Sequence, residues 1–116
     1  MQIHLEMEIT NYSWELRAGN TNLGTLTTYG WYDWPWIGCK FEPTKEFEMY
    51  RHLFDSSLHF LETGEIEKLD ELTEQINQLI KLIPLNELTQ PVSEYSLYIE
   101  GKDTRLRAIF IESPDD

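Results

Sequence analysis

The chain has 116 residues, and its 21 acidic residues against 9 basic ones give a net charge of −12 at neutral pH. This length is typical of one domain, and an apolar content of 41% is enough for a core without a disulfide or a metal. The charge argues against direct binding of nucleic acid or anionic lipid, because phosphate binding needs clustered Lys and Arg. We expect a single domain over residues 1–116, whose acidity serves either solubility alone or docking onto a basic partner.

The N-terminal segment predicts a strand rather than a targeting signal. Apolar and charged residues alternate over residues 3–9, and no basic region precedes an apolar run. No apolar stretch approaches the ~20 residues that span a bilayer. Cys39 is the only cysteine, so no intramolecular disulfide can form, which fits a reducing compartment. We therefore expect a cytoplasmic protein that binds no membrane.

Alternation predicts two further strands in the first third of the chain. Residues 12–16 alternate apolar and polar side chains, and residues 25–31 are rich in Thr and aromatic residues. Turn-forming residues dominate residues 19–24 between them. Together with the strand over residues 3–9, these segments predict an antiparallel meander. The segment from Trp31 to Pro43 is predicted to be irregular.

Apolar residues at helical spacing predict two helices in the centre of the chain. The first follows Thr44, which suits an N-cap, and stops at Gly64, which fits the position just past a helix. The second begins at Ile66, carries an apolar stripe and ends at Pro84. Its polar side carries the acids Glu67, Asp70, Glu71 and Glu74. The short connection predicts either a helical hairpin or one kinked helix.

The last part of the chain predicts a terminal β-hairpin. Residues 95–99 and 106–110 alternate on either side of a turn at residues 101–103, after a linker over residues 85–91. The predicted order is thus β-β-β-α-α-β-β. It indicates an α+β fold, an antiparallel sheet of about five strands with a two-helix layer on one face.

The aromatic residues are densest just before the first predicted helix. Three of the four tryptophans fall within six residues, at Trp31, Trp34 and Trp36. Alternation puts Trp31 and Asp33 on one side and Tyr32, Trp34 and Trp36 on the other, and one strand cannot easily bury both sets. Two interpretations stay open. The segment is either an aromatic plug at the end of the sheet or an exposed platform for a partner or ligand.

The same segment carries the pattern W-x-D-x-P-x-x-x-C-x-F-x-P, from Trp31 to Pro43, and leads into an acidic helix. In this pattern the chain resembles small, uncharacterised bacterial proteins that share the loop. The resemblance covers the central third of the chain. It implies that the loop and the helix after it form one unit, and it implies no function, cofactor or site residue.

Catalytic and metal-binding motifs are not recognisable in this sequence. Cys39 is more typical of a small buried hydrophobe than of a nucleophile, although Lys40 adjoins it. His52 and His59 are two helical turns apart, about 10 Å along the axis, too far to bind one metal unaided. Phosphate-binding glycine loops and nucleophile elbows are missing as well. We expect no enzymatic activity, no metal and no cofactor.

These observations favour a non-enzymatic interaction protein. It would be an acidic binder, inhibitor or immunity-like factor, of bacterial or phage type, for a basic protein partner. The aromatic segment would provide affinity and the acidic helix face would select the partner. The expected contact residues are Trp31, Tyr32, Asp33, Trp34, Trp36, Glu67, Asp70, Glu71 and Glu74. The alternative is a small-molecule binding module with a pocket lined by the Trp31–Trp36 loop.

Overall fold

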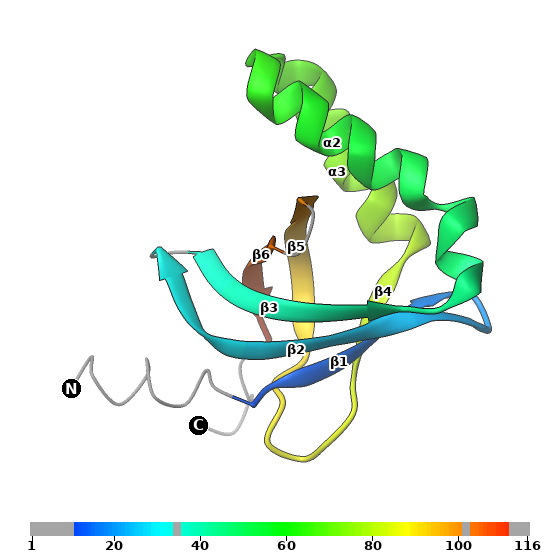
Figure 1. Ribbon diagram of the computed structural model, residues 1–116, viewed down its shortest axis with the longest axis vertical. Coiled ribbons are helices and arrows are strands. Elements are labelled where there is room, and N and C mark those ends of the chain that lie inside the picture. Colours follow the sequence, from blue (N-terminus) through cyan, green and yellow to red (C-terminus); the bar gives the residue numbers. More distant parts are fainter. Residues whose placement is uncertain (1–10, 34–35, 101–102, 112–116) are drawn as a thin grey trace.

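The computed structural model describes residues 11–33, 36–100 and 103–111, and for residues 31–33 it describes the backbone alone. The described chain is an α+β fold, as predicted, built on an antiparallel sheet with strand order β4-β1-β2-β3-β6-β5. The sheet curls, and two helices lie together over one end of it (Figure 1). In chain order the elements are β1 (Ser13–Ala18), β2 (Thr21–Asp33), β3 (Trp36–Pro43), the 3-10 helix η1 (Lys45–Met49), α2 (Arg51–Thr63), α3 (Ile66–Leu79), β4 (Lys81–Pro84), β5 (Val92–Glu100) and β6 (Asp103–Phe110).

The described sheet has six strands, whereas about five were predicted, and the observed strands are not all the predicted ones. β1, β2, β5 and β6 match predicted strands, whereas β3 and β4 were not predicted. The predicted strand over residues 3–9 lies outside the described residues. The prediction of a terminal hairpin is confirmed, because β5 and β6 pair from Val92↔Phe110 to Glu100↔Asp103.

The prediction of an irregular segment from Trp31 to Pro43 is wrong. β2 and β3 form a long hairpin that pairs from Gly24↔Pro43 to Asp33↔Trp36, with two irregularities in its register. Pro43 is compatible with this strand because it is the last residue, where a missing N–H costs little. Gly38 makes room within the strand, since a Cβ there would lie 2.5 Å from the Tyr29 ring.

The core fills the concave side of the curled sheet. Trp14 and Leu16 are fully buried there, and the Trp14 indole Nε1 donates a hydrogen bond to the carbonyl of Gln90 over 2.9 Å. Leu106 lies opposite both Ile37 and Leu97, so β3, β6 and β5 bury one continuous apolar layer. Because apolar residues alternate with polar ones along these strands, a single face of the sheet supplies this core.

Of the two arrangements predicted for residues 44–84, a helical hairpin or one kinked helix, the structure has the hairpin, and its turn is where it was predicted. Gly64 caps α2 in the left-handed conformation at φ 77°. The predicted start and end of the hairpin are wrong. The first predicted helix is divided into η1 and α2, and the Thr44 hydroxyl donates to the Asn22 carbonyl instead of capping a helix.

Helix α3 stops at Leu79 rather than at Pro84, because Ile80 is extended and residues 81–84 pair with β1 as strand β4. In β4, Leu82 lies opposite Leu16 and is buried in the core.

β4 and β5 are the two edges of the sheet that the described residues form, and the C-terminal end of α3 contacts both. The Tyr95 hydroxyl of β5 donates a hydrogen bond over 2.7 Å to the carbonyl of Ile80, the residue before β4. This contact joins the two edges at the end of α3. None of the described helices is long and apolar enough to cross a membrane.

Candidate functional site

The acidic side predicted for the second helix is present and exposed. Glu67, Asp70, Glu71 and Glu74 are spaced i, i+3, i+4 and i+7, which places them on one face of α3. We call this set the acidic arc. Within the described residues, none of its carboxylates forms an ion pair. Lys68, the only cation on α3, is instead paired with Glu65 at 3.0 Å.

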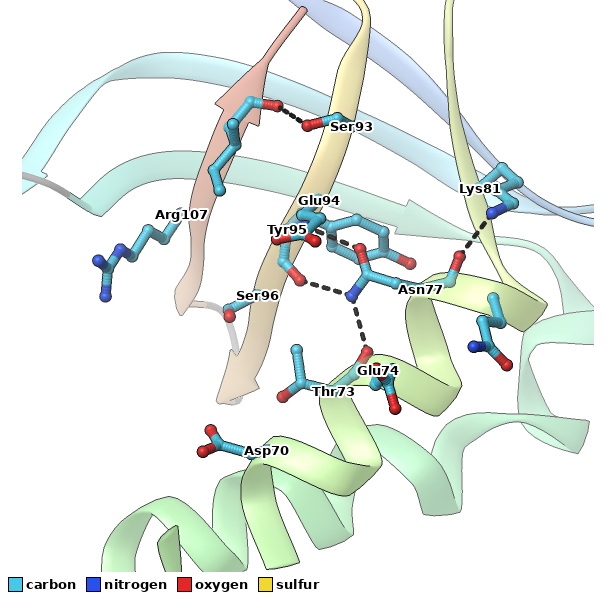
Figure 2. Close-up of a pocket in the computed structure, with 12 residues that line it drawn as sticks. Asp70, Thr73, Glu74, Asn77, Lys81, Ser93, Glu94, Tyr95, Ser96 and Arg107 are labelled. Atoms are coloured by element: carbon cyan, nitrogen blue, oxygen red, sulfur yellow. Dashed lines mark hydrogen bonds between the residues drawn. The ribbon is translucent and has the colours of Figure 1, made fainter. Parts of the chain in front are cut away.

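A groove with a volume of about 600 Å³ runs between α3 and the β5–β6 hairpin (Figure 2). Asp70 and Glu74 of the acidic arc stand on its helix wall, and Glu94 stands on its strand wall. Its other lining residues are mostly polar, namely Thr73, Asn77, Gln78, Lys81, Ser93, Tyr95, Ser96, Arg107 and Ile109. The size is that of sites for small ligands or single side chains.

Asn77 sets the spacing between the two walls of this groove. Its side-chain Nδ2 donates to the carbonyl of Tyr95 over 2.8 Å, and its Oδ1 accepts from the Tyr95 N–H over 2.9 Å (Figure 2). Nδ2 also donates to the carbonyl of Thr73 within α3. The amide therefore replaces a neighbouring strand at this point of the β5 edge, which otherwise would carry unpaired backbone groups.

The two cations at the groove, Lys81 and Arg107, form no ion pair with its carboxylates. Lys81 donates a hydrogen bond from Nζ to the carbonyl of Asn77 over 2.8 Å, so it serves the C-terminal end of α3. Arg107 is exposed and stands on the β6 side, across the groove from α3 (Figure 2). Among the described residues no ion pair crosses the groove. Its carboxylates are thus available to a cationic group from outside.

A small recess lies beside the groove, between α2, α3 and β5. Its volume is about 10 Å³, and it is lined by Phe54, Ser57, Thr73, Ile76, Tyr95, Ser96, Leu97 and Tyr98. Ser57 is 3% exposed, and its Oγ has no hydrogen-bond partner in the described part of the chain. Buried hydroxyls are normally satisfied, so an unsatisfied one indicates a missing partner.

Of the predicted aromatic platform, the structure describes one side chain. Trp36 is half-buried and packs on Tyr98, with ring centroids 5.3 Å apart. Tyr98 is in turn flanked by the guanidinium of Arg105, which pairs with Glu100 at 3.1 Å. The side chains of Trp31, Tyr32 and Asp33, and all of Trp34, lie outside the described part. Their expected role stays a prediction.

The groove is not where the sequence places a pocket. Its described lining includes no residue of the Trp31–Trp36 segment, and it joins the acidic arc to two strands that the sequence did not connect with it. Sequence reasoning missed Asn77 and Thr73. A usable signal existed, because these polar residues lie four apart beside the apolar stripe of the predicted helix, and Asn is a poor helix former.

The sequence offers Cys39 for nucleophilic chemistry and His52 and His59 for metal binding, and the structure places these residues in different surroundings. Cys39 is buried, its thiol points to the carbonyl of Ile37 at 3.7 Å, and burial raises its pKa to about 12. It is the small buried hydrophobe that the sequence predicts. His52 and His59 are exposed on α2. The described residues contain no group of three or more His, Cys, Asp or Glu side chains that could hold a metal ion.

Comparison with known proteins gives no match, since no family model fits the chain and no curated protein or solved structure is significantly similar to it. The function is therefore argued from the acidic arc, the groove and the recess.

Proposed function

We propose that this protein is a non-enzymatic binding protein that captures a basic segment of a protein partner on the acidic arc of α3. One observation carries the proposal. Four exposed carboxylates occupy one helix face, and none of them forms an ion pair within the described residues.

Such an arrangement costs stability in the isolated protein. Like charges three and four residues apart on a helix repel one another, by about 0.2–0.5 kcal/mol per pair. A partner with clustered Lys or Arg removes this repulsion and is steered toward the arc by the same field. The proposed role is that of an inhibitor or immunity-like factor that covers a basic surface of its partner in the cytoplasm.

The aromatic segment extends the proposed surface. Trp36 packs on Tyr98, and Tyr98 lines the recess beside the groove, so the aromatic contacts and the acidic arc flank the same part of β5. Partly exposed Trp side chains provide contact area at a low cost in conformational entropy. In this proposal they add affinity, and the arc selects a basic partner.

The test measures binding of a fluorescent lysine-rich peptide at low and at high salt. The variant Glu67→Gln/Asp70→Asn/Glu71→Gln/Glu74→Gln removes the arc. A matched control, Asp55→Asn/Glu62→Gln/Glu87→Gln/Asp103→Asn, removes the same charge from exposed sites elsewhere. We expect the arc variant to bind about tenfold more weakly or worse and the control to change little, because attraction at close range exceeds that of screened distant charges. Equal losses in both variants contradict the proposal.

A further inference from the structure

The recess adjoins the groove. Thr73, Tyr95 and Ser96 line both, so these three residues form the boundary between the groove and the recess that holds Ser57. The recess has room for one group about the size of a water molecule. The groove outside it can hold the chain to which such a group is attached.

Backbone groups of β5 add to the polar lining of the recess. Tyr95 directs its N–H and C=O away from β6, since Asn77 takes both. In an antiparallel strand this orientation repeats at every second residue. Leu97, two residues on in an undisturbed register, therefore also directs its N–H and C=O away from β6, on the side where the recess lies. Among the described residues, the Leu97 N–H and C=O have no hydrogen-bond partner.

The recess thus offers hydrogen-bond acceptors, and carboxylates stand outside it. Ser57 Oγ and the Leu97 carbonyl can accept hydrogen bonds inside the recess. Along the groove the three carboxylates of Asp70, Glu74 and Glu94 outnumber the two cations, Lys81 and Arg107. A primary ammonium matches both parts, because it is compact, carries three N–H donors and is positively charged. A guanidinium is planar and much larger than the recess. A water molecule fits the recess, but it is neutral and forms no ion pair with the carboxylates.

We propose that the groove and the recess bind the ammonium group of a lysine side chain from the partner. The ammonium donates hydrogen bonds to Ser57 Oγ and to the Leu97 carbonyl, and its aliphatic stem lies between Thr73 of α3 and Ser96 of β5. The carboxylates of Asp70 and Glu74 offset the cost of removing the charge from water. This inference rests on the proposed function and specifies it, because it predicts a preference for lysine over arginine.

The experiment compares two peptides of equal length and charge, one with Lys and one with Arg at the same positions. Affinity is measured by fluorescence anisotropy, and amide chemical shifts are followed by NMR. For the unmodified protein we expect the Lys peptide to bind about tenfold more tightly and to shift the Leu97 amide. Ser57→Ala should abolish that preference, with a loss of about tenfold for the Lys peptide alone, the scale of one hydrogen bond to a charged group. An unchanged amide spectrum of the free variant verifies that it is folded.

A pair of double variants separates the groove from the arc as a whole. Asp70→Asn/Glu74→Gln removes the two carboxylates that line the groove, and Glu67→Gln/Glu71→Gln removes the two that do not. Both change the charge of the same helix face by the same amount. We expect the first to weaken the Lys peptide several-fold more than the second.

Three results overturn the inference, and a fourth overturns the proposed function. If the Lys and Arg peptides bind the unmodified protein equally well, or if Ser57→Ala leaves their ratio unchanged, the recess holds only water. If the two double variants lose affinity equally, the arc acts as an undivided charged surface, and the proposed function stands without the groove. If removal of the whole arc leaves peptide binding unchanged, the proposed function itself fails.

Discussion

Helices α2 and α3 are nearly equal in length, at 13 and 14 residues, and each has one apolar side, yet they are attached to the sheet in different ways. α2 inserts Phe54 into the core, where the ring lies 5.5 Å from that of Phe47. α3 buries Leu69 and Ile76, and it is held to β5 by the side-chain amide of Asn77.

Helices α2 and α3 also differ in whether their charged side chains form ion pairs. The cation at the start of α2, Arg51, forms an ion pair with Glu48 at 2.7 Å, and this hydrogen bond lowers the pKa of the Glu48 carboxyl. The acids of the arc on α3 have no such partner in the described chain. Ile66 and Leu79, at the two ends of the apolar stripe of α3, remain 55% and 42% exposed. We infer that α2 stabilises the fold through apolar burial, whereas α3 forms a polar wall along a sheet edge and is the helix suited to binding.

The largest effect should come from the apolar anchor of α2. We expect Phe54→Ala to lower the free energy of unfolding by about 3–5 kcal/mol, because it removes a fully buried ring and leaves a cavity. Urea denaturation followed by circular dichroism measures it. His52→Ala, at an exposed site of the same helix, should change stability by less than about 0.5 kcal/mol. If Phe54→Ala costs no more than truncating Asn77, the contrast between the helices is wrong.

The polar anchor of α3 should rank second. Asn77→Ala leaves the N–H and C=O of Tyr95 without their partner, and we expect a loss of about 1–3 kcal/mol. Hydrogen exchange of the Tyr95 amide should become faster in this variant by more than the global loss of stability explains. Gln75→Ala, exposed on the same helix, is the matched control. Unchanged exchange at Tyr95 would show that another group protects the β5 edge.

The smallest effect concerns the phenol that joins β5 to the end of α3. Tyr95→Phe removes the hydrogen bond to the Ile80 carbonyl, and we expect a loss of about 1 kcal/mol at neutral pH. The same group makes stability depend on pH. Burial raises the pKa of Tyr95 above its ordinary value of 10.0, since the phenolate is disfavoured in the core.

The sign of that dependence follows from proton binding. Above pH 10 the unfolded chain has lost the Tyr95 proton while the folded protein retains it, so the free energy of unfolding falls as pH rises, by at most about 1.4 kcal/mol per pH unit. Cys39, whose pKa is also raised, adds a similar fall that begins near pH 9. We therefore compare Cys39→Ala with Cys39→Ala/Tyr95→Phe by denaturation between pH 8 and about pH 11. A fall equally steep in both would contradict the assignment to Tyr95.

Local patterns in the sequence predicted several elements correctly. The helix stop at Gly64, the alternation on either side of the turn before Asp103 and the acidic spacing on α3 each depend on residues close together in the chain. β3 and β4 were missed for a common reason. Pro43 and Pro84 are helix and strand breakers in isolation, but each lies at the last position of its strand, where the sheet does not need its N–H.

The candidate site also has one part that local sequence patterns predict and another part that they do not. Periodicity alone places Glu67, Asp70, Glu71 and Glu74 on one exposed face of a helix, because a helix repeats every 3.6 residues whatever surrounds it. The groove and the recess were decided by the tertiary structure. They exist because the curled sheet leaves β5 as an edge, and because Asn77 holds α3 beside that edge with Ser57 of α2 behind it. These residues are up to 38 positions apart in the chain, from Ser57 to Tyr95, and no local pattern links them. The sequence alone determined the charge of the acidic arc, and only the packing of two helices against a sheet edge decided which groove and recess lie beside it.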